Sequence, residues 1–120
     1  MPTVELTVDN NVATLLLNRP HAKNAIDLEM NDALEMALLE IDRDRDIRAV
    51  IITGAGDAFC SGGDVRAMNA AAGQITVDAR RQRMQRAQRI VKTLADMDRP
   101  VIAAVDGVAY GAGFSLALLA

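Results

Sequence analysis

Residues 100–120 place a strand pattern, a glycine turn and a helix pattern directly after one another, and this succession limits the possible folds more than any other stretch. The apolar run 101–105 predicts a buried strand, and Gly111-Ala112-Gly113 predicts a turn that opens an apolar helix reaching Ala120. The first backbone N–H groups of a helix have no intrahelical partner and carry the positive end of the helix dipole. Because glycine lets a ligand approach the backbone, this turn is predicted to hold an anion or an oxyanion.

A second glycine turn repeats this arrangement earlier in the chain. The β-branched run 49–53 predicts a strand covered on both faces, and the glycines of 54–57 end it. Residues 59–64 predict a small-residue turn before a short helix over 65–70, with Asp64 as its N-cap. The turns 62–64 and 111–113 can each offer a backbone N–H to one oxygen, as in an oxyanion hole. Tight backbone packing is the alternative explanation for such glycines.

The remaining pattern completes an α/β chain with no internal domain boundary, so we expect one domain over 1–120. Alternation over 4–8 and the run 12–17 predict a β-hairpin. Asp27 is predicted to cap a helix whose apolar residues form one face: Met30, Ala33, Leu34, Ala37, Leu38 and Ile41. A long helix from Asp78 to about Met97 is predicted to bury another set: Met84, Ala87, Ile90, Val91, Leu94 and Ala95. The final helix has no capping residue before Ala120, so the chain is expected to be cut within an element.

Composition excludes several functional classes. A formal net charge of −3 and an aromatic content of 2% argue against nucleic-acid binding. No apolar run approaches the roughly 18 residues that span a bilayer, and the N-terminus has no leader pattern, so we expect no membrane association. Cys60 is the only cysteine, and no Cys/His cluster has metal-site spacing, so we expect no metal and a cytoplasmic location.

Other chemical motifs fail or have simpler explanations. Phe59 stands where a dinucleotide-binding fingerprint needs its third glycine, and neither glycine turn is followed by the Lys-Ser or Lys-Thr of a phosphate-binding loop. Cys60 and Ser61 lack a neighbouring base, which disfavours a covalent nucleophile, and His21 is interpreted as a loop residue that can still contact a ligand. The arginines of 80–89, with Lys92, favour a solvated or subunit-facing surface over a phosphate site. Met30, Met68 and Met84 are predicted to fill the core.

Three segments together resemble a known family. They are Leu17-Asn18-Arg19-Pro20 through Asn24-Ala25, Ile52-Thr53-Gly54 through Ser61-Gly62-Gly63-Asp64, and Pro100-Val101-Ile102-Ala103 through Gly113. In this order and spacing the chain resembles the N-terminal part of the crotonase, or enoyl-CoA hydratase/isomerase, superfamily. The resemblance implies an α/β, ClpP/crotonase-type ββα spiral whose C-terminal half is incomplete here.

The resemblance also implies a site. It assigns the oxyanion hole to the N–H groups of Gly63 and Ala112, which would stabilise the enolate of an acyl-CoA thioester. The residues implied to contact CoA or the thioester channel are Ala22, Lys23, Ala25, Ser61, Gly62, Asp64, Val65, Gly111 and Ser115. Coenzyme A would be part of the substrate, with no separate cofactor, and the family implies a homotrimer or hexamer.

One departure narrows the implied reaction. Family hydratases carry a glutamate where this chain has Ser115, and a hydroxyl cannot replace that carboxylate as acid and base. The resemblance therefore favours an enoyl-CoA isomerase, whose proton-moving carboxylate is expected after Ala120. The alternatives are a non-catalytic acyl-CoA-binding protein and a truncated product of the same fold.

Overall fold

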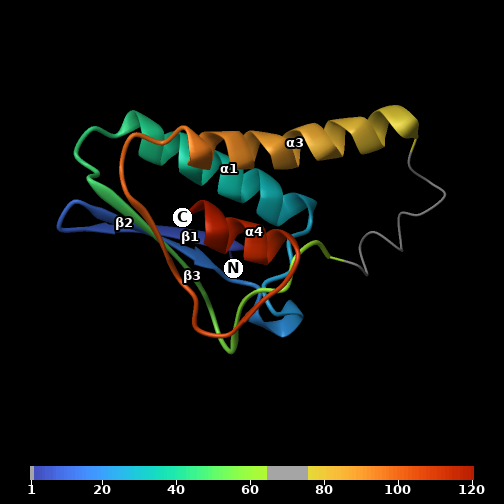
Figure 1. Ribbon diagram of the computed structural model, residues 1–120, viewed down its shortest axis with the longest axis horizontal. Helices are drawn as coiled ribbons and strands as arrows, with labels where there is room; N and C mark the ends of the chain where they lie inside the picture. Colours follow the sequence, from blue (N-terminus) through green and yellow to red (C-terminus); the bar gives the residue numbers. More distant parts are fainter. Residues whose placement is uncertain (1, 65–75) are drawn as a thin grey trace.

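The computed structural model describes residues 2–64 and 76–120, the side chain of Phe114 excepted. Its main sheet has the strand order β1-β2-β3-β5, formed by β1 (Val4–Asp9), β2 (Val12–Leu17), β3 (Ala49–Gly54) and β5 (Val101–Ala104) (Figure 1). The first two strands are an antiparallel hairpin, as predicted, and β2, β3 and β5 are parallel. Asn10 and Asn11 make the hairpin turn with φ of 51° and 67°, a left-handed conformation that asparagine tolerates.

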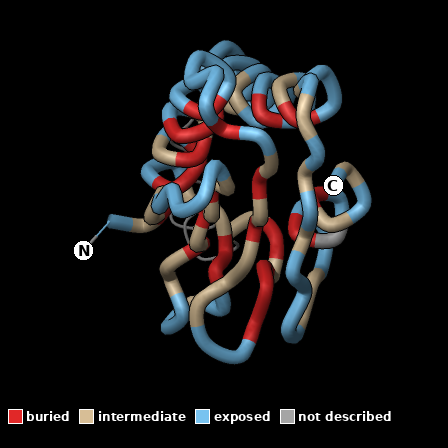
Figure 2. Tube along the Cα trace, turned by 90° about the vertical axis from the view of Figure 1, so that its left-hand side faces the viewer, coloured by how far each residue is buried: buried red, intermediate tan, exposed pale blue. Residues whose placement is uncertain are grey.

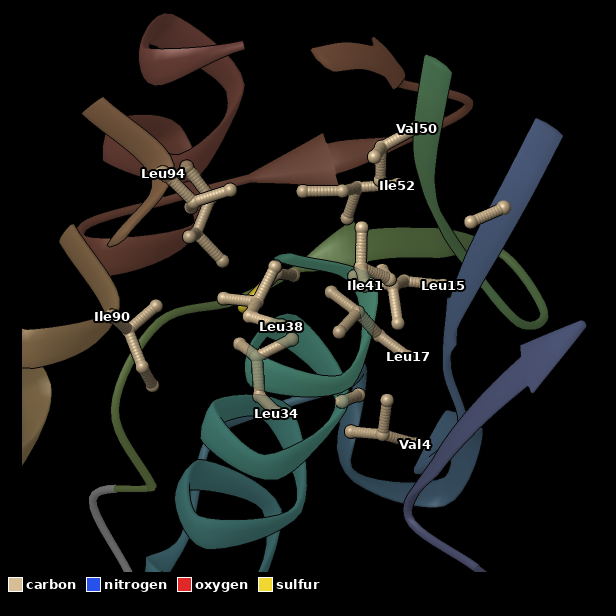
Figure 3. Packing of buried hydrophobic residues seen from close by; sticks show 14 of the residues in the cluster. Val4, Leu15, Leu17, Leu34, Leu38, Ile41, Val50, Ile52, Ile90 and Leu94 are labelled. Atoms are coloured by element: carbon tan, nitrogen blue, oxygen red, sulfur yellow. The ribbon is translucent and has the colours of Figure 1, made fainter. Parts of the chain in front are cut away.

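Helix α1 (Leu28–Arg43) covers one face of this sheet and confirms the predicted helix and its cap. The carboxylate of Asp27 accepts a hydrogen bond of 2.8 Å from the Met30 N–H. Leu34, Leu38 and Ile41 of α1 meet side chains of β2 and β3 (Figure 3). Figure 2 shows the buried positions gathered where the helices meet the sheet. The labelled core residues are Val4, Leu15, Leu17, Leu34, Leu38, Ile41, Val50, Ile52, Ile90 and Leu94.

Helix α3 (Val77–Ala95) lies beside α1, but its apolar face is only partly buried. Ile90 and Leu94 are buried, whereas Met84 is 65% exposed and Val91 is 43% exposed. Figure 1 shows that the N-terminal half of α3 projects past the end of α1, so α1 does not cover it. The prediction that Met84 fills the core is therefore wrong, while Met30 is fully buried as predicted. Met68 lies outside the described residues.

The arginines of α3 are not only a solvated surface. Arg89 Nε lies 2.6 Å from the carboxylate of Glu35, and Arg86 lies 3.8 Å from that of Asp32. Both carboxylates belong to α1, so these ion pairs join the two helices. Because these pairs are exposed to solvent, each contributes little to stability.

The strands around the glycine turns differ from the sequence prediction in their position and burial. Phe59 and Cys60 do not form a turn but belong to a buried strand β4 (Ala58–Cys60), which pairs in parallel with β6 (Val108–Ala109). β5 is not buried, because it is an edge strand of the main sheet and Ile102 is 54% exposed. In β3, Val50 and Ile52 are buried and Ile51 is intermediate, so only one face of that strand is fully covered.

The final helix α4 (Ala112–Leu119) confirms the predicted apolar helix. Leu116 is buried and Leu118 is 69% exposed. Gly113 packs directly on the carbonyl of Cys60, where a side chain has no room. Tight packing therefore accounts for this one glycine. None of the helices that the structure describes is long and apolar enough to cross a membrane.

Candidate active site

The two glycine turns meet at the ends of β4 and β6. Because these strands are parallel, their carboxyl ends lie at the same edge, and the turn after each strand starts there. The Tyr110 N–H donates to the Cys60 carbonyl at 3.0 Å. A methyl group placed on Gly62 would lie 3.0 Å from the Tyr110 carbonyl oxygen and 3.6 Å from the Ala112 nitrogen. The predicted proximity of the two turns is therefore present in the fold.

The backbone around Gly63 is held by a β-bridge to Ile26. The Ile26 N–H donates to the Gly62 carbonyl at 2.7 Å, and the Asp64 N–H donates to the Ile26 carbonyl at 3.0 Å. Successive amides of an extended chain point in opposite directions, so the Gly63 N–H is turned away from Ile26. Gly62 has φ of 102°, which only glycine adopts readily.

Ala112 is the first residue of α4. The next amide, that of Gly113, donates to Tyr110, and the Ser115 N–H donates to Gly111. Within residues 2–64 and 76–120, neither the Ala112 N–H nor the Gly63 N–H has a protein acceptor. Among the described residues, two backbone donors from different turns are thus left for a ligand.

Gly63 and Ala112, which carry these donors, both line one cavity of about 570 Å³. The first turn of α1 forms much of its wall, and Arg83 and Ala87 contribute from α3. Of the predicted contact residues, Gly63, Asp64 and Ala112 line this cavity. The helix that Asp64 was predicted to cap, and Val65, lie outside the described residues.

A second cavity of about 170 Å³ adjoins the first. Ser115 lines it, and its hydroxyl lies 3.4 Å from the Gly111 carbonyl of the preceding helical turn. The residues shared by the two cavities are Ile26, Asn31, Ala87 and Ala112. A group bound at Ala112 therefore has access to both spaces.

The segment 22–25 lies beside Ser61 and outside both cavity walls. The Ser61 N–H donates to the Lys23 carbonyl at 3.0 Å, and its hydroxyl lies 3.4 Å from the Ala22 carbonyl. Ala25 is buried, whereas the side chain of Lys23 is exposed and follows the 3-10 helix η1 (Pro20–Ala22). Gly62 and Gly111 belong to the two turns but line neither cavity.

Sequence reasoning missed the ion pairs that hold this site together. Arg19 lies 3.1 Å from the carboxylate of Asp64 and 3.5 Å from that of Asp27, and it also donates to the Ala25 carbonyl. The side chains of Arg19 and Asp64 are only 13% and 14% exposed. Asp27 caps α1 and Asp64 follows Gly63, so Arg19 joins the start of α1 to the second glycine turn.

Cys60 and His21 are the other side chains considered for nucleophilic or ligand-binding roles. Cys60 is buried, and burial raises the pKa of its thiol, opposed in part by a hydrogen bond to the backbone of Gly62. His21 is exposed in η1. In the part of the chain that the structure describes, no group of His, Cys, Asp or Glu side chains is placed to hold a metal ion.

Sequence comparison with known proteins finds a matching family and related proteins. A family model described as enoyl-CoA hydratase/isomerase matches residues 7–120. The 1,2-epoxyphenylacetyl-CoA isomerase of Escherichia coli is 40% identical over 111 residues, which are 92% of this chain and 42% of that protein.

Solved structures give the same result. A crystal structure of an enoyl-CoA hydratase from Mycobacterium smegmatis superposes with a TM-score of 0.91 at 32% identity, covering 99% of this chain and 46% of that one. An enoyl-CoA hydratase/isomerase from Xanthobacter autotrophicus gives a TM-score of 0.91 at 34% identity, with 98% and 43% covered. The α/β fold is thus that of part of these structures, and the chain spans less than half the length of each relative.

Proposed function

Because the chain belongs to the enoyl-CoA hydratase/isomerase family, we propose that it supplies the oxyanion hole of an acyl-CoA enzyme. In this proposal the Gly63 and Ala112 N–H groups both bind the thioester oxygen. The observation that carries it is that these two N–H groups lack a protein acceptor within the described residues and that both residues line one cavity of about 570 Å³. Removing one such donor costs other enzymes about 3 kcal/mol or more of transition-state stabilisation.

The reaction we propose is a double-bond shift. With a 3-enoyl-CoA, a base takes a proton from the carbon next to the thioester, and the C–H electron pair moves onto the carbonyl oxygen to give an enolate. The two N–H groups then stabilise the negative charge where it develops. Return of a proton to the γ carbon gives the conjugated 2-enoyl-CoA, so no atom is gained or lost.

The proton-moving group is proposed to lie in the part of the relatives beyond the matched region. The carboxylates of the larger cavity are those of Asp27, Glu29 and Asp64, and Arg19 binds the two aspartates. Because the carboxylates of Asp27 and Asp64 lie 3.5 Å and 3.1 Å from the Arg19 guanidinium, these two are proposed to have structural roles.

Isomerisation is preferred over hydration for two reasons. Ser115 stands where hydratases of the family carry their glutamate, and its hydroxyl lies beside a carbonyl of its own helix. The E. coli relative is named an isomerase, so an isomerase occurs among the relatives of this chain. Hydration remains the competing reaction, because the M. smegmatis relative is named a hydratase.

The same proposal places the CoA moiety beside the segment that contains Ala22, Lys23 and Ala25, with the exposed Lys23 meeting a phosphate. Ser61, Gly62, Asp64, Val65 and Gly111 are proposed to flank the thioester. We further propose a cytoplasmic trimer or hexamer that needs no cofactor beyond the coenzyme A of its substrate.

The decisive experiment follows ultraviolet absorbance when a 3-enoyl-CoA is added to the purified protein in its complete form. Isomerisation is expected to raise the absorbance of the conjugated thioester. Hydration of a 2-enoyl-CoA without any isomerisation would reverse the preference between the two reactions.

A non-catalytic acyl-CoA-binding protein is the second candidate, and Ser115 is the observation that favours it. Isothermal titration calorimetry with acyl-CoA esters separates the two. Binding without turnover supports the second candidate, and the absence of binding contradicts both.

A further inference from the structure

Asn31 is a polar side chain buried where the two cavities meet. It lies in α1, is 8% exposed, and lines both cavities. Its side-chain nitrogen Nδ2 is buried and has no hydrogen-bond partner among the described residues. A buried amide donor without an acceptor opposes folding, so its presence calls for a functional reason.

The surroundings of Asn31 make it distinctive. In the smaller cavity the other lining side chains are apolar, except for Ser115. The Ser115 hydroxyl already faces the carbonyl of Gly111 at 3.4 Å. The Asn31 amide is therefore the unpaired polar group at this wall, and rotation about its last side-chain bond would turn either a donor or an acceptor toward the cavity.

The position of Asn31 relative to the proposed oxyanion hole defines what it can contact. Ala112 lines both cavities, as Asn31 does. A thioester held by the Ala112 N–H therefore has its acyl chain next to the space that Asn31 borders.

We propose that Asn31 is a specificity-determining residue that hydrogen-bonds an oxygen substituent on the acyl chain, beyond the thioester. The substrate class is an acyl-CoA whose chain carries a hydroxyl or oxo group, in preference to a plain alkyl chain. This inference rests on the proposed function. An alkyl chain would cover the amide without pairing it, and sites with unpaired buried polar groups discriminate against such ligands.

The test measures binding rather than turnover. Hexanoyl-CoA and a set of hexanoyl-CoA esters hydroxylated at successive carbons beyond the thioester are titrated into the complete protein by calorimetry. For at least one hydroxylated ester we expect binding about tenfold tighter than for hexanoyl-CoA. Asn31→Leu is expected to remove this gain while binding hexanoyl-CoA at least as tightly as the wild type.

Two further variants keep the test decisive. Asn31→Ala removes the amide without adding volume, and it is expected to lose the same preference should Asn31→Leu fail to fold. Gln85→Ala removes an exposed amide from α3 and is expected to retain the wild-type preference. The melting temperature of ligand-free Asn31→Leu is expected to rise, because an unpaired buried donor is replaced by an apolar group.

The possible failures are distinguishable. If hexanoyl-CoA binds and no hydroxylated ester binds more tightly, or if Asn31→Leu and Asn31→Ala keep the preference, this inference is overturned and the proposed function stands. If none of the esters binds, the proposed function is overturned and this inference with it.

Discussion

The guanidinium of Arg19 lies 3.1 Å from the carboxylate of Asp64, and this pair connects the loop before α1 to the turn that contains Gly63. The same guanidinium reaches Asp27, the residue that caps α1. Arg19 lines neither cavity, so we infer that it acts on the Gly63 N–H only through the neighbouring Asp64. Arg19 is a positioning residue in the proposed site.

Arg19→Lys is expected to lower kcat by about tenfold to a hundredfold with little change in KM, because small displacements of a stabilising group cost this much. Lysine keeps the charge but lacks the planar set of donors that reaches both carboxylates and the Ala25 carbonyl. Steady-state kinetics on a 3-enoyl-CoA give the two constants. Arg45→Lys, in the exposed segment after α1, is the control and should keep both. A purely structural role would instead lower the melting temperature and leave kcat per folded molecule unchanged.

Asn24→Ala is expected to lower the free energy of unfolding by about 3 kcal/mol or more. Asn24 is fully buried, its amide donates to the carbonyls of Ala55 and Ala58 at 2.9 Å each, and its oxygen accepts from the Arg19 N–H at 2.8 Å. Truncation leaves these three backbone groups without that partner.

Asn10→Ala separates this effect from backbone strain. Asn10 and Asn24 have similar left-handed φ values of 51° and 58°, but Asn10 is exposed. Urea unfolding of Asn10→Ala should report only the conformational cost, about 1 kcal/mol. Equal losses for both variants would mean that the hydrogen bonds of Asn24 contribute nothing.

Cys60 is expected to make stability fall at alkaline pH. Burial raises the pKa of its thiol above that of the unfolded chain, so the folded state holds the proton more tightly. The resulting stabilisation is complete below the unfolded pKa of about 8.5 and is lost as pH rises toward the folded pKa, with a slope of at most about 1.4 kcal/mol per pH unit.

Cys60→Ala tests this pH dependence, because alanine retains the Cβ against which Gly113 packs. Urea unfolding is measured for both proteins at neutral pH and at about one unit above the unfolded pKa. The wild type should lose more free energy of unfolding than the variant over this interval. Parallel losses would show that other groups cause the decline.

The predicted elements that the structure confirms are those whose signals are local. The hairpin and α1 have clear periods of two and 3.6 residues, and Asp27 stands where a cap is needed. β4 and β6 are too short to show a period, so Cys60 was assigned to a turn. Periodicity identifies the apolar face of α3 but not the element that packs against it. The sequence therefore predicts burial for Met84, which is exposed in the structure.

The features of the candidate site likewise separate into those that have a local sequence signal and those that have none. Glycines beside helix starts signal the two turns, and parallel pairing of β4 with β6 brings them together. Arg19 and Asn24 gave no such signal, because their partners are set by the tertiary fold and a polar loop residue has no period. Only the family resemblance of the segment that contains Arg19 and Asn24 suggests a buried role for these two residues.

Ala112→Pro removes one proposed oxyanion donor without changing the elements around it. Ala112 is the first residue of α4, where proline is tolerated because the first N–H of a helix has no intrahelical acceptor. The preceding residue, Gly111, has φ of 52° and is therefore not in the right-handed helical conformation that proline disfavours. We expect kcat to fall by about a hundredfold or more, with a melting temperature close to that of the wild type. Ala112→Ser keeps the N–H and should retain most of the activity. If Ala112→Pro turns over a 3-enoyl-CoA as fast as Ala112→Ser does, the Ala112 N–H is not a catalytic donor, and the oxyanion must be stabilised elsewhere.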